Sequence, residues 1–199
     1  DADGIFFFDD IRFGKWIVKE LAPAEGFVAN DTVFPINVTT DGAVIEIEAE
    51  NRHIYGMVHT TKVDKDYPDN LLAGAIFEIY MDVDGNKEFN ADVDTLVGEM
   101  VEYEPGLYEL ENLRYCGYFL YEKHAPANYV KDDDYHYFAI VNDGEMVEVE
   151  NEAGIGFINN HMVGNLKSVK SSSDGRVEGF SFRVTGENYD EVFKTDANG

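Results

Sequence analysis

Sulfur and positive charge are both scarce in this chain. Its 199 residues contain one cysteine, Cys116, which excludes an internal disulfide and a metal site built on paired cysteines. Only 15 lysines and arginines stand against 40 aspartates and glutamates, so the formal net charge is −25. Because phosphates and anionic lipids are bound by clustered positive side chains, we expect neither a nucleic acid nor a lipid surface as a partner.

Long apolar runs are absent as well. A helix that crosses a bilayer needs about 20 consecutive apolar residues, and no run approaches that length, so we expect no membrane insertion in this segment. The first residues, 1–4, do not resemble a signal peptide. Hydrophobic residues still make up 44% of the chain and aromatic residues 14%. That apolar content argues against disorder, because it can bury enough surface to form a core.

Short segments of alternating character indicate an all-β fold. Residues 44–50 and 146–150 alternate apolar and acidic side chains, which is typical of a strand with one buried face. No segment requires a long helix. Aspartate–glycine pairs, which favour tight turns, follow the short apolar segments at residues 41–42, 84–85, 143–144 and 174–175. Many short strands with such turns predict a sandwich or a barrel.

The chain also repeats itself. Residues 4–20 match residues 106–122. In both copies a glutamate, Glu20 or Glu122, is followed by Ala-Pro and then by an aromatic residue and a valine, although the Ala-Pro lies one residue closer to Glu20. Trp16 matches an aromatic residue of the second copy and lies among apolar residues, so we expect it to pack in a core.

Further downstream, two more pairs of segments match in the same order. Residues 51–62 match residues 159–170, and residues 74–77 match residues 179–182. The repeat is therefore out of frame with the chain. It predicts three parts, namely the back half of one unit at residues 1–56, a complete unit at residues 57–163 and the front half of a third unit at residues 164–199.

These blocks resemble the Cna-B, or SpaA-type, pilin domain. The resemblance rests on the motifs Lys62-Val63-Asp64, Leu72-Ala73-Gly74-Ala75-x-Phe77-Glu78 and Glu122-x-x-Ala125-Pro126-x-x-Tyr129, followed by a strand that ends at Asn159. It covers nearly the whole chain when both halves are counted. Domains of that family are stacked in surface adhesins and pili of Gram-positive bacteria. The resemblance implies a prealbumin-like, Ig-like β-sandwich in tandem repeats, at the cell surface or cell wall.

The resemblance further implies an internal covalent bond. It places Lys62 and Asn159 on neighbouring first and last strands that face an aromatic core, with Glu122 between them. A buried lysine can lose its proton and become a nucleophile, while a buried Glu122 can polarise the Asn159 amide and carry protons. Attack with loss of ammonia leaves a Lys62–Asn159 isopeptide bond. The reaction is a single turnover, so we do not expect an enzyme.

One alternative to this assignment stays open. Asn151 is a second candidate for the acceptor; we prefer Asn159 because its spacing to Gly164 equals that of Asn51 to Gly56.

The half-units hold a second set of the same residue types in permuted order, Lys170, Glu20 and Asn51. These three residues meet within one chain or between neighbouring chains, or the two halves belong to an interrupted tandem array and stay apart.

One acidic segment is a weak candidate for a Ca²⁺ site. It offers the oxygen ligands Asp82, Asp84, Asn86 and Glu88. The glycine of this segment is not at the sixth position that an EF-hand loop requires, and an acidic hairpin loop explains the pattern as well. We expect no other cofactor.

Taken together, the sequence predicts a structural stalk or spacer segment of a surface adhesin or pilin-like protein, with neighbouring repeats as partners. The alternative is an extracellular β-sandwich module that binds a carbohydrate, a host protein or calcium without a crosslink. An enzyme with turnover is disfavoured, because no separate pair of nucleophile and base is present.

Overall fold

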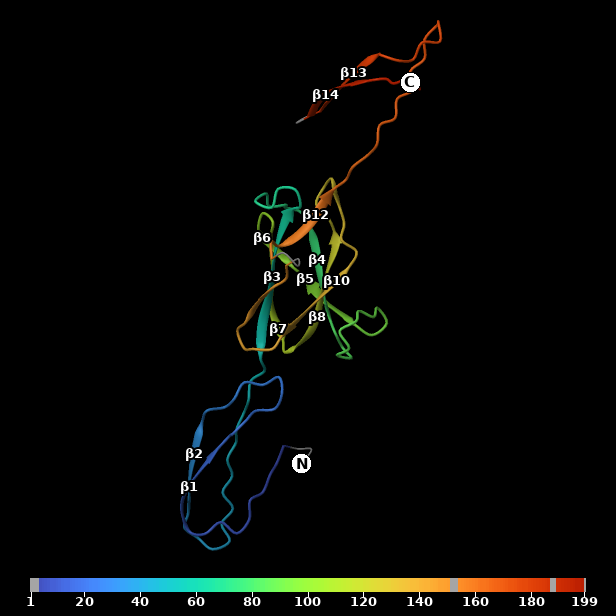
Figure 1. The fold of residues 1–199 in the computed structure, drawn as a ribbon. Coiled ribbons are helices and arrows are strands. Elements are labelled where there is room, and N and C mark those ends of the chain that lie inside the picture. Colours follow the sequence, from blue (N-terminus) through green and yellow to red (C-terminus); the bar gives the residue numbers. More distant parts are fainter. Residues whose placement is uncertain (1–3, 151–153, 187–188, 199) are drawn as a thin grey trace. The chain divides into compact units, whose positions relative to one another are not determined.

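The computed structural model describes residues 4–150, 154–186 and 189–198, and its fold is all-β (Figure 1). The chain divides into two compact units, Asp1–Met162 and Val163–Gly199. Within the described ranges, no helix is long and apolar enough to cross a membrane. The larger unit contains a β-sandwich, as the sequence predicts.

A six-stranded sheet forms one layer of this sandwich. Its central strand is β3 (Tyr55–Asp64), which pairs antiparallel with β7 (Leu107–Arg114) and parallel with β12 (Phe157–His161). The strand order is β6-β7-β3-β12-β9, and β11 also pairs parallel with β3. The three outer strands are β6 (Val101–Glu104), β9 (Tyr129–Val130) and β11 (Met146–Glu148).

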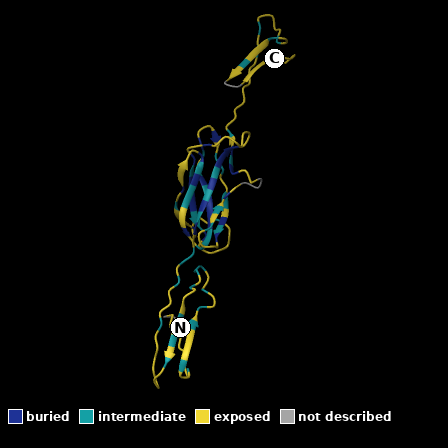
Figure 2. Ribbon diagram, turned by 90° about the vertical axis from the view of Figure 1, so that its left-hand side faces the viewer, coloured by how far each residue is buried: buried dark blue, intermediate teal, exposed yellow. Residues whose placement is uncertain are grey.

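A four-stranded antiparallel sheet forms the other layer, in the order β10-β8-β4-β5. Its strands are β4 (Ile76–Met81), β5 (Thr95–Glu99), β8 (Cys116–His124) and β10 (Tyr135–Ile140). The two sheets share one apolar core, in which the Phe77 ring lies 5.0 Å from the rings of both Tyr108 and Phe157. Buried residues are concentrated here, as Figure 2 shows in dark blue.

The parallel pairing of β3 with β12 determines where the chain enters and leaves the sandwich. It enters at Tyr55, and β12 pairs only with the far end of β3, where Phe157 lies opposite Lys62. Because both strands run in the same direction, the chain leaves at His161, at the opposite end from Tyr55.

Before the sandwich, residues 4–53 contain one pair of antiparallel strands, β1 (Gly14–Lys19) and β2 (Val33–Val38). Two expectations fail here. Trp16 is 45% exposed instead of lying in a core, because no second sheet covers β1–β2 among the described residues of this segment. Residues 44–50 form no strand, since no described strand lies alongside to pair with them.

This segment contacts the entry end of the sandwich. Arg52 forms an ion pair with Asp143, in the loop after β10. The Tyr115 hydroxyl, between β7 and β8, donates a hydrogen bond to Glu25, and Phe27 forms a β-bridge with His53. Residues 25–53 are therefore held at the Tyr55 end of the sandwich.

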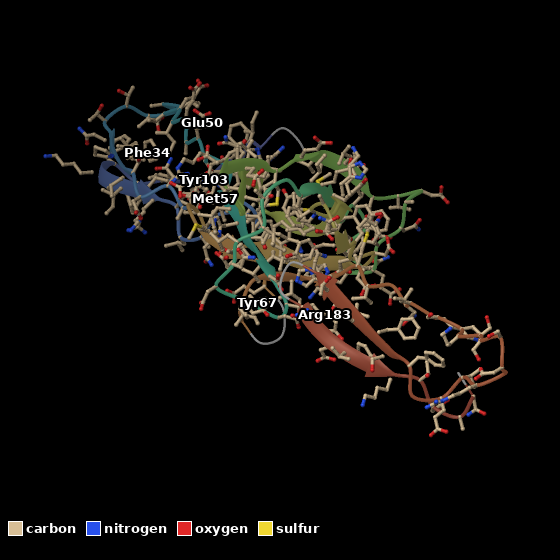
Figure 3. The ribbon with its side chains drawn as sticks, turned by 90° about the horizontal axis from the view of Figure 1, so that it is seen from above. Phe34, Glu50, Met57, Tyr67, Tyr103 and Arg183 are labelled. Atoms are coloured by element: carbon tan, nitrogen blue, oxygen red, sulfur yellow. The ribbon has the colours of Figure 1, made fainter. Side chains whose placement is uncertain are left out.

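The smaller unit contains a single antiparallel pair of strands, β13 (Ser181–Gly186) and β14 (Tyr189–Lys194). Arg183, labelled in Figure 3, forms a two-pronged ion pair with Asp190 across the two strands. Most of its apolar side chains are exposed, including Phe182 and Phe193. A single pair of strands buries little apolar surface, which makes it marginal as an isolated structure.

Candidate functional site

Lys62, Glu122 and Asn159 meet inside the sandwich, although each comes from a different strand. Lys62 lies near the end of β3 and Asn159 on the adjacent β12, whereas Glu122 reaches across from β8 in the facing sheet. All three are buried, with exposed fractions of 0%, 0% and 2%. Buried charged and amide groups at a sheet interface are uncommon unless they are paired, so the cluster requires a structural or chemical explanation.

The two carboxylate oxygens of Glu122 face two different nitrogen atoms. Oε1 lies 3.3 Å from the Lys62 Nζ. Oε2 accepts a hydrogen bond of 2.9 Å from the Asn159 Nδ2 and one of 2.8 Å from the Asp132 backbone N–H. Glu122 therefore bridges the lysine amine and the asparagine amide nitrogen.

Aromatic rings surround the lysine amine. The Lys62 Nζ lies 4.5 Å from the centre of the Phe157 ring and 6.0 Å from that of Phe77, and it donates a hydrogen bond of 3.1 Å to the Phe157 carbonyl. Burial disfavours the ammonium and lowers the pKa of Lys62 to about 8, although the Glu122 carboxylate opposes this shift. A substantial fraction of the amine is thus neutral near physiological pH.

The asparagine amide is oriented with its nitrogen engaged and its oxygen free. Asn159 Nδ2 donates a second hydrogen bond, of 2.9 Å, to the Val130 carbonyl. Among the described residues, the buried Asn159 Oδ1 and Glu122 Oε1 have no hydrogen-bond partner. Unsatisfied buried polar atoms are rare and costly. Here Glu122 Oε1 faces the Lys62 amine, and the Asn159 carbonyl oxygen is not engaged in a hydrogen bond that would hold the amide.

The structure thus brings Lys62, Glu122 and Asn159 together, while the bond and the role of each residue stay predictions. The alternative acceptor Asn151 lies outside the described residues. The hydrogen bonds from the Asp132 backbone and to the Val130 carbonyl were not predicted from the sequence. The signal was present in the repeat, because Asn30 follows Glu20 at the same spacing at which Asp132 follows Glu122.

Two of the three residues of the second set also meet. Glu20 Oε2 accepts hydrogen bonds from the Asn51 Nδ2, at 2.9 Å, and from the Asn30 backbone N–H, at 2.7 Å. Asn51 Nδ2 also donates to the Val28 carbonyl, at 2.9 Å. Hydrogen bonds from the Asn30 backbone and the Asn51 side chain lower the pKa of Glu20. The third residue, Lys170, belongs to the smaller unit.

A buried carboxylate next to the cluster was not predicted from the sequence. Asp64, which is 1% exposed, accepts a hydrogen bond of 2.7 Å from the Tyr129 hydroxyl and lies 2.9 Å from the His161 ring. Burial raises the pKa of Asp64, but the hydrogen bonds from Tyr129 and from the backbone of Asp66 and Tyr67 outweigh it and lower the pKa overall. Asp64 ties β3 to β9 and β12 beside Asn159.

The proposed calcium ligands are only partly brought together. Oxygen atoms of Asp82, Asp84 and Asp94 lie within 4.8 Å of one another. Glu88 is not in this cluster, and the Asn86 Nδ2 donates a hydrogen bond of 3.0 Å to Asp84. Both oxygens of Asp82 already accept backbone hydrogen bonds from the loop, as in an acidic hairpin loop. Calcium binding stays a prediction, which a calorimetric titration tests.

The family model of SpaA, described as a prealbumin-like fold domain, matches residues 1–53 and 56–153. The chain belongs to this family. No curated protein sequence matches the chain.

Solved structures of other proteins are also similar to this chain. The Bacillus anthracis TIE protein is 24% identical with a TM-score of 0.65, and the match covers 94% of this chain and 33% of that one. The Streptococcal ancillary pilin is 23% identical over 77% of this chain and 43% of its own, with a TM-score of 0.37. BcpA, the major pilin subunit of Bacillus cereus, is 23% identical over 54% of this chain and 29% of its own, with a TM-score of 0.41. The chain spans about a third of the TIE protein's length, and that similarity shows the fold.

Proposed function

We propose that the chain is a structural stalk or spacer segment of a Gram-positive surface adhesin or pilin-like protein, stabilised by a self-formed Lys62–Asn159 isopeptide bond. Membership of the SpaA family supports the structural role. The observation that carries the proposal is the position of Glu122, whose two oxygens face the Lys62 amine and the Asn159 amide nitrogen. Neighbouring units of the same kind are the proposed partners.

The chemistry follows from that position. The neutral Lys62 Nζ attacks the Asn159 amide carbon, so that a new C–N bond forms and the carbonyl oxygen takes up negative charge. Glu122 accepts the proton that Lys62 Nζ loses at Oε1 and delivers a proton to Asn159 Nδ2, which faces Oε2. The bond from the amide carbon to Nδ2 then breaks and ammonia leaves. The folded core holds the reactants in place, which supplies the rate.

The bond would sit directly on the path of a pulling force. Force applied along the chain enters β3 at Tyr55 and leaves β12 at His161. Without the bond, the load is carried by the short parallel pairing of β3 with β12. This pairing runs only from Phe157 opposite Lys62 to Asn159 opposite Asp64. With the bond, the load passes from β3 to β12 through a covalent link, and residues 63–158 are not stretched. This is the property that a stalk or spacer needs.

Intact-mass spectrometry tests the proposal. The wild-type protein is expected to be lighter than its sequence mass by one ammonia, whereas Lys62→Ala and Asn159→Ala are expected to keep their full mass. Lys65→Ala is the matched control, because Lys65 lies three residues away and outside the cluster; it is expected to lose ammonia like the wild type. Full mass in the wild type would contradict the proposal.

The pH dependence of bond formation gives a second test. With the pKa of Lys62 lowered to about 8, the neutral amine rises from about 1% at pH 6 to about half at pH 8. Unreacted chain refolded from inclusion bodies is therefore expected to lose ammonia about fifty-fold faster at pH 8 than at pH 6, as followed by mass against time. Raising the pH of the slow sample to 8 should restore the fast rate. A rate that does not change with pH would exclude the neutral amine as the attacking group.

A further inference from the structure

Two backbone groups in the segment that begins at the end of β9 hold the reacting side chains. The Val130 carbonyl accepts a hydrogen bond of 2.9 Å from the Asn159 Nδ2. The Asp132 N–H donates a hydrogen bond of 2.8 Å to the Glu122 Oε2. One short segment therefore sets the orientation of both the glutamate and the asparagine amide.

The Asp132 side chain fixes this segment from the other side. Its Oδ1 accepts a hydrogen bond of 2.9 Å from the Asp134 N–H, and its Oδ2 lies 3.0 Å from the His136 Nε2. His136 lies on β10, and its ring meets the Phe157 ring edge to face, with 4.8 Å between the centres. The Phe157 ring in turn lies 4.5 Å from the Lys62 Nζ. The Asp132–His136 pair therefore lies directly behind the groups that surround the lysine amine.

The Glu20–Asn51 pair of the preceding segment is held in the same way. The Val28 carbonyl accepts a hydrogen bond of 2.9 Å from the Asn51 Nδ2, and the Asn30 N–H donates one of 2.7 Å to Glu20. The Asn30 Oδ1 also accepts a hydrogen bond of 2.9 Å from the Thr32 N–H, two residues later. A neutral asparagine at this position therefore makes the same turn and allows the same two backbone contacts.

The two copies differ in charge at this segment. Asn30 stands where the sandwich has Asp132, and Phe34 stands where it has His136, at matching places of the two strand pairs. Because the asparagine keeps the same backbone geometry, the negative charge of Asp132 is not needed to orient the segment. The charge of Asp132 and its contact with His136 therefore require another explanation.

The charge of Asp132 acts on the Lys62 amine. Burial lowers the pKa of Lys62 to about 8, while the negative charges of Glu122 and, to a smaller extent, Asp132 oppose that shift. Two further groups around the amine are the rings of Phe77 and Phe157, which carry no charge. Because only the neutral amine attacks, a negative charge beside it slows the reaction at low pH.

Other titratable groups near this end of the sandwich are engaged with partners of their own. The Asp64 carboxylate accepts a hydrogen bond from the Tyr129 hydroxyl and contacts the His161 ring. Lys131 forms an ion pair with Asp133. These pairs leave the Asp132 carboxylate as the second source of charge at the lysine amine, after the glutamate.

We propose that Asp132 and His136 regulate the formation of the Lys62–Asn159 bond, an inference that rests on the proposed function. Asp132 is a positioning residue, because its backbone N–H holds Glu122 in place. Its carboxylate keeps the lysine protonated at low pH and so delays the reaction. His136 reduces this delay, because its Nε2–H donates to the carboxylate and partly offsets the charge.

The pH profile of ammonia loss in refolded, unreacted chain tests this regulation. Asp132→Asn keeps the side-chain oxygen and the backbone N–H but removes the charge, so a larger share of Lys62 is neutral at low pH. This variant is expected to react about three- to tenfold faster than the wild type at pH 6 and at the same rate at pH 9, where the amine is mostly neutral in both. His136→Phe is expected to react more slowly than the wild type at pH 6.

Asp133→Asn is the matched control, because it removes the same charge one residue away. The Asp133 side chain is 81% exposed and is paired with Lys131, so its profile is expected to follow the wild type. A role in folding alone would slow Asp132→Asn at every pH. That result, or a rate at pH 6 equal to that of the wild type, overturns the proposal.

A titration of the lysine itself gives a measurement that does not depend on the bond. In an Asn159→Ala background Lys62 stays unreacted, and NMR of its side chain against pH reads its pKa directly. Adding Asp132→Asn is expected to lower this pKa, and adding His136→Phe to raise it. A Lys62 pKa that neither substitution changes overturns the proposal.

The outcomes separate this inference from the proposed function. Full mass in the wild type at every pH contradicts both. Loss of ammonia in the wild type, with the same pH profile in Asp132→Asn and His136→Phe, leaves the proposed function intact and refutes this inference alone. A faster reaction of Asp132→Asn at pH 6 only, together with a lowered Lys62 pKa, is the result that the inference predicts.

Discussion

The Lys62→Met/Glu122→Gln double variant is expected to unfold well below the wild type in temperature. Closing a loop of roughly 100 residues by a covalent bond stabilises a domain by about 4–5 kcal/mol in the chain-entropy model, which corresponds to roughly 15–30 °C in Tm. Calorimetry of both proteins measures the difference.

The double variant is chosen because single variants mix two effects. Removing Lys62 alone leaves the Glu122 carboxylate buried without its partner, which is itself strongly destabilising. Replacing both residues by neutral side chains of similar size removes the buried charges together, and such replacements are often neutral or stabilising. The remaining loss then reports the missing bond. A double variant as stable as the wild type would show that no covalent bond stabilises the wild-type protein.

Under a pulling force, the wild-type sandwich is expected not to extend at all. If Lys62 and Asn159 are bonded, residues 63–158 carry no load, because the force passes from β3 to β12 through the bond. In Lys62→Ala the same residues unravel and add roughly 30 nm of contour length. Single-molecule force spectroscopy with handles at both ends of the chain measures this step.

Lys123→Ala is the control for the force experiment. Lys123 is adjacent to Glu122 on β8 but forms ion pairs with Glu78 and Glu99 at a partly exposed position. Of the two partners only Glu99 is exposed, whereas Glu78 is buried. The variant keeps Lys62, Glu122 and Asn159, so the bond still forms and the variant should resist extension like the wild type. An unfolding step of the full length in the wild type would contradict a bond between β3 and β12.

Much of this site could be predicted from the sequence because its residues lie in repeated motifs. The all-β class followed from the alternation and the turns, and the contact of Lys62, Glu122 and Asn159 from the family resemblance. The parallel pairing of β3 with β12 did not follow, because alternation reports which face of a strand is buried and not the direction of its neighbour.

Other features depend on tertiary context that a local pattern does not contain. Residues 44–50 alternate like residues 146–150, but only the latter include a strand, β11, because β3 lies beside it. Trp16 matches the buried Tyr118 and is nevertheless exposed, because nothing described covers β1. Asp64 looked like an ordinary acidic residue after a strand; its burial depends on Tyr129 and His161, which are distant in sequence.

The identification of the linked residues by peptide mass spectrometry tests the central claim most directly. Digestion of the folded, purified wild type is expected to yield one branched peptide in which the Lys62 side chain is joined to Asn159, with the mass of both fragments less one ammonia. The same digest of Glu122→Gln is expected to yield the two linear peptides. Linear peptides alone in the wild type, or a branch at Asn151 instead of Asn159, would contradict the Lys62–Asn159 bond.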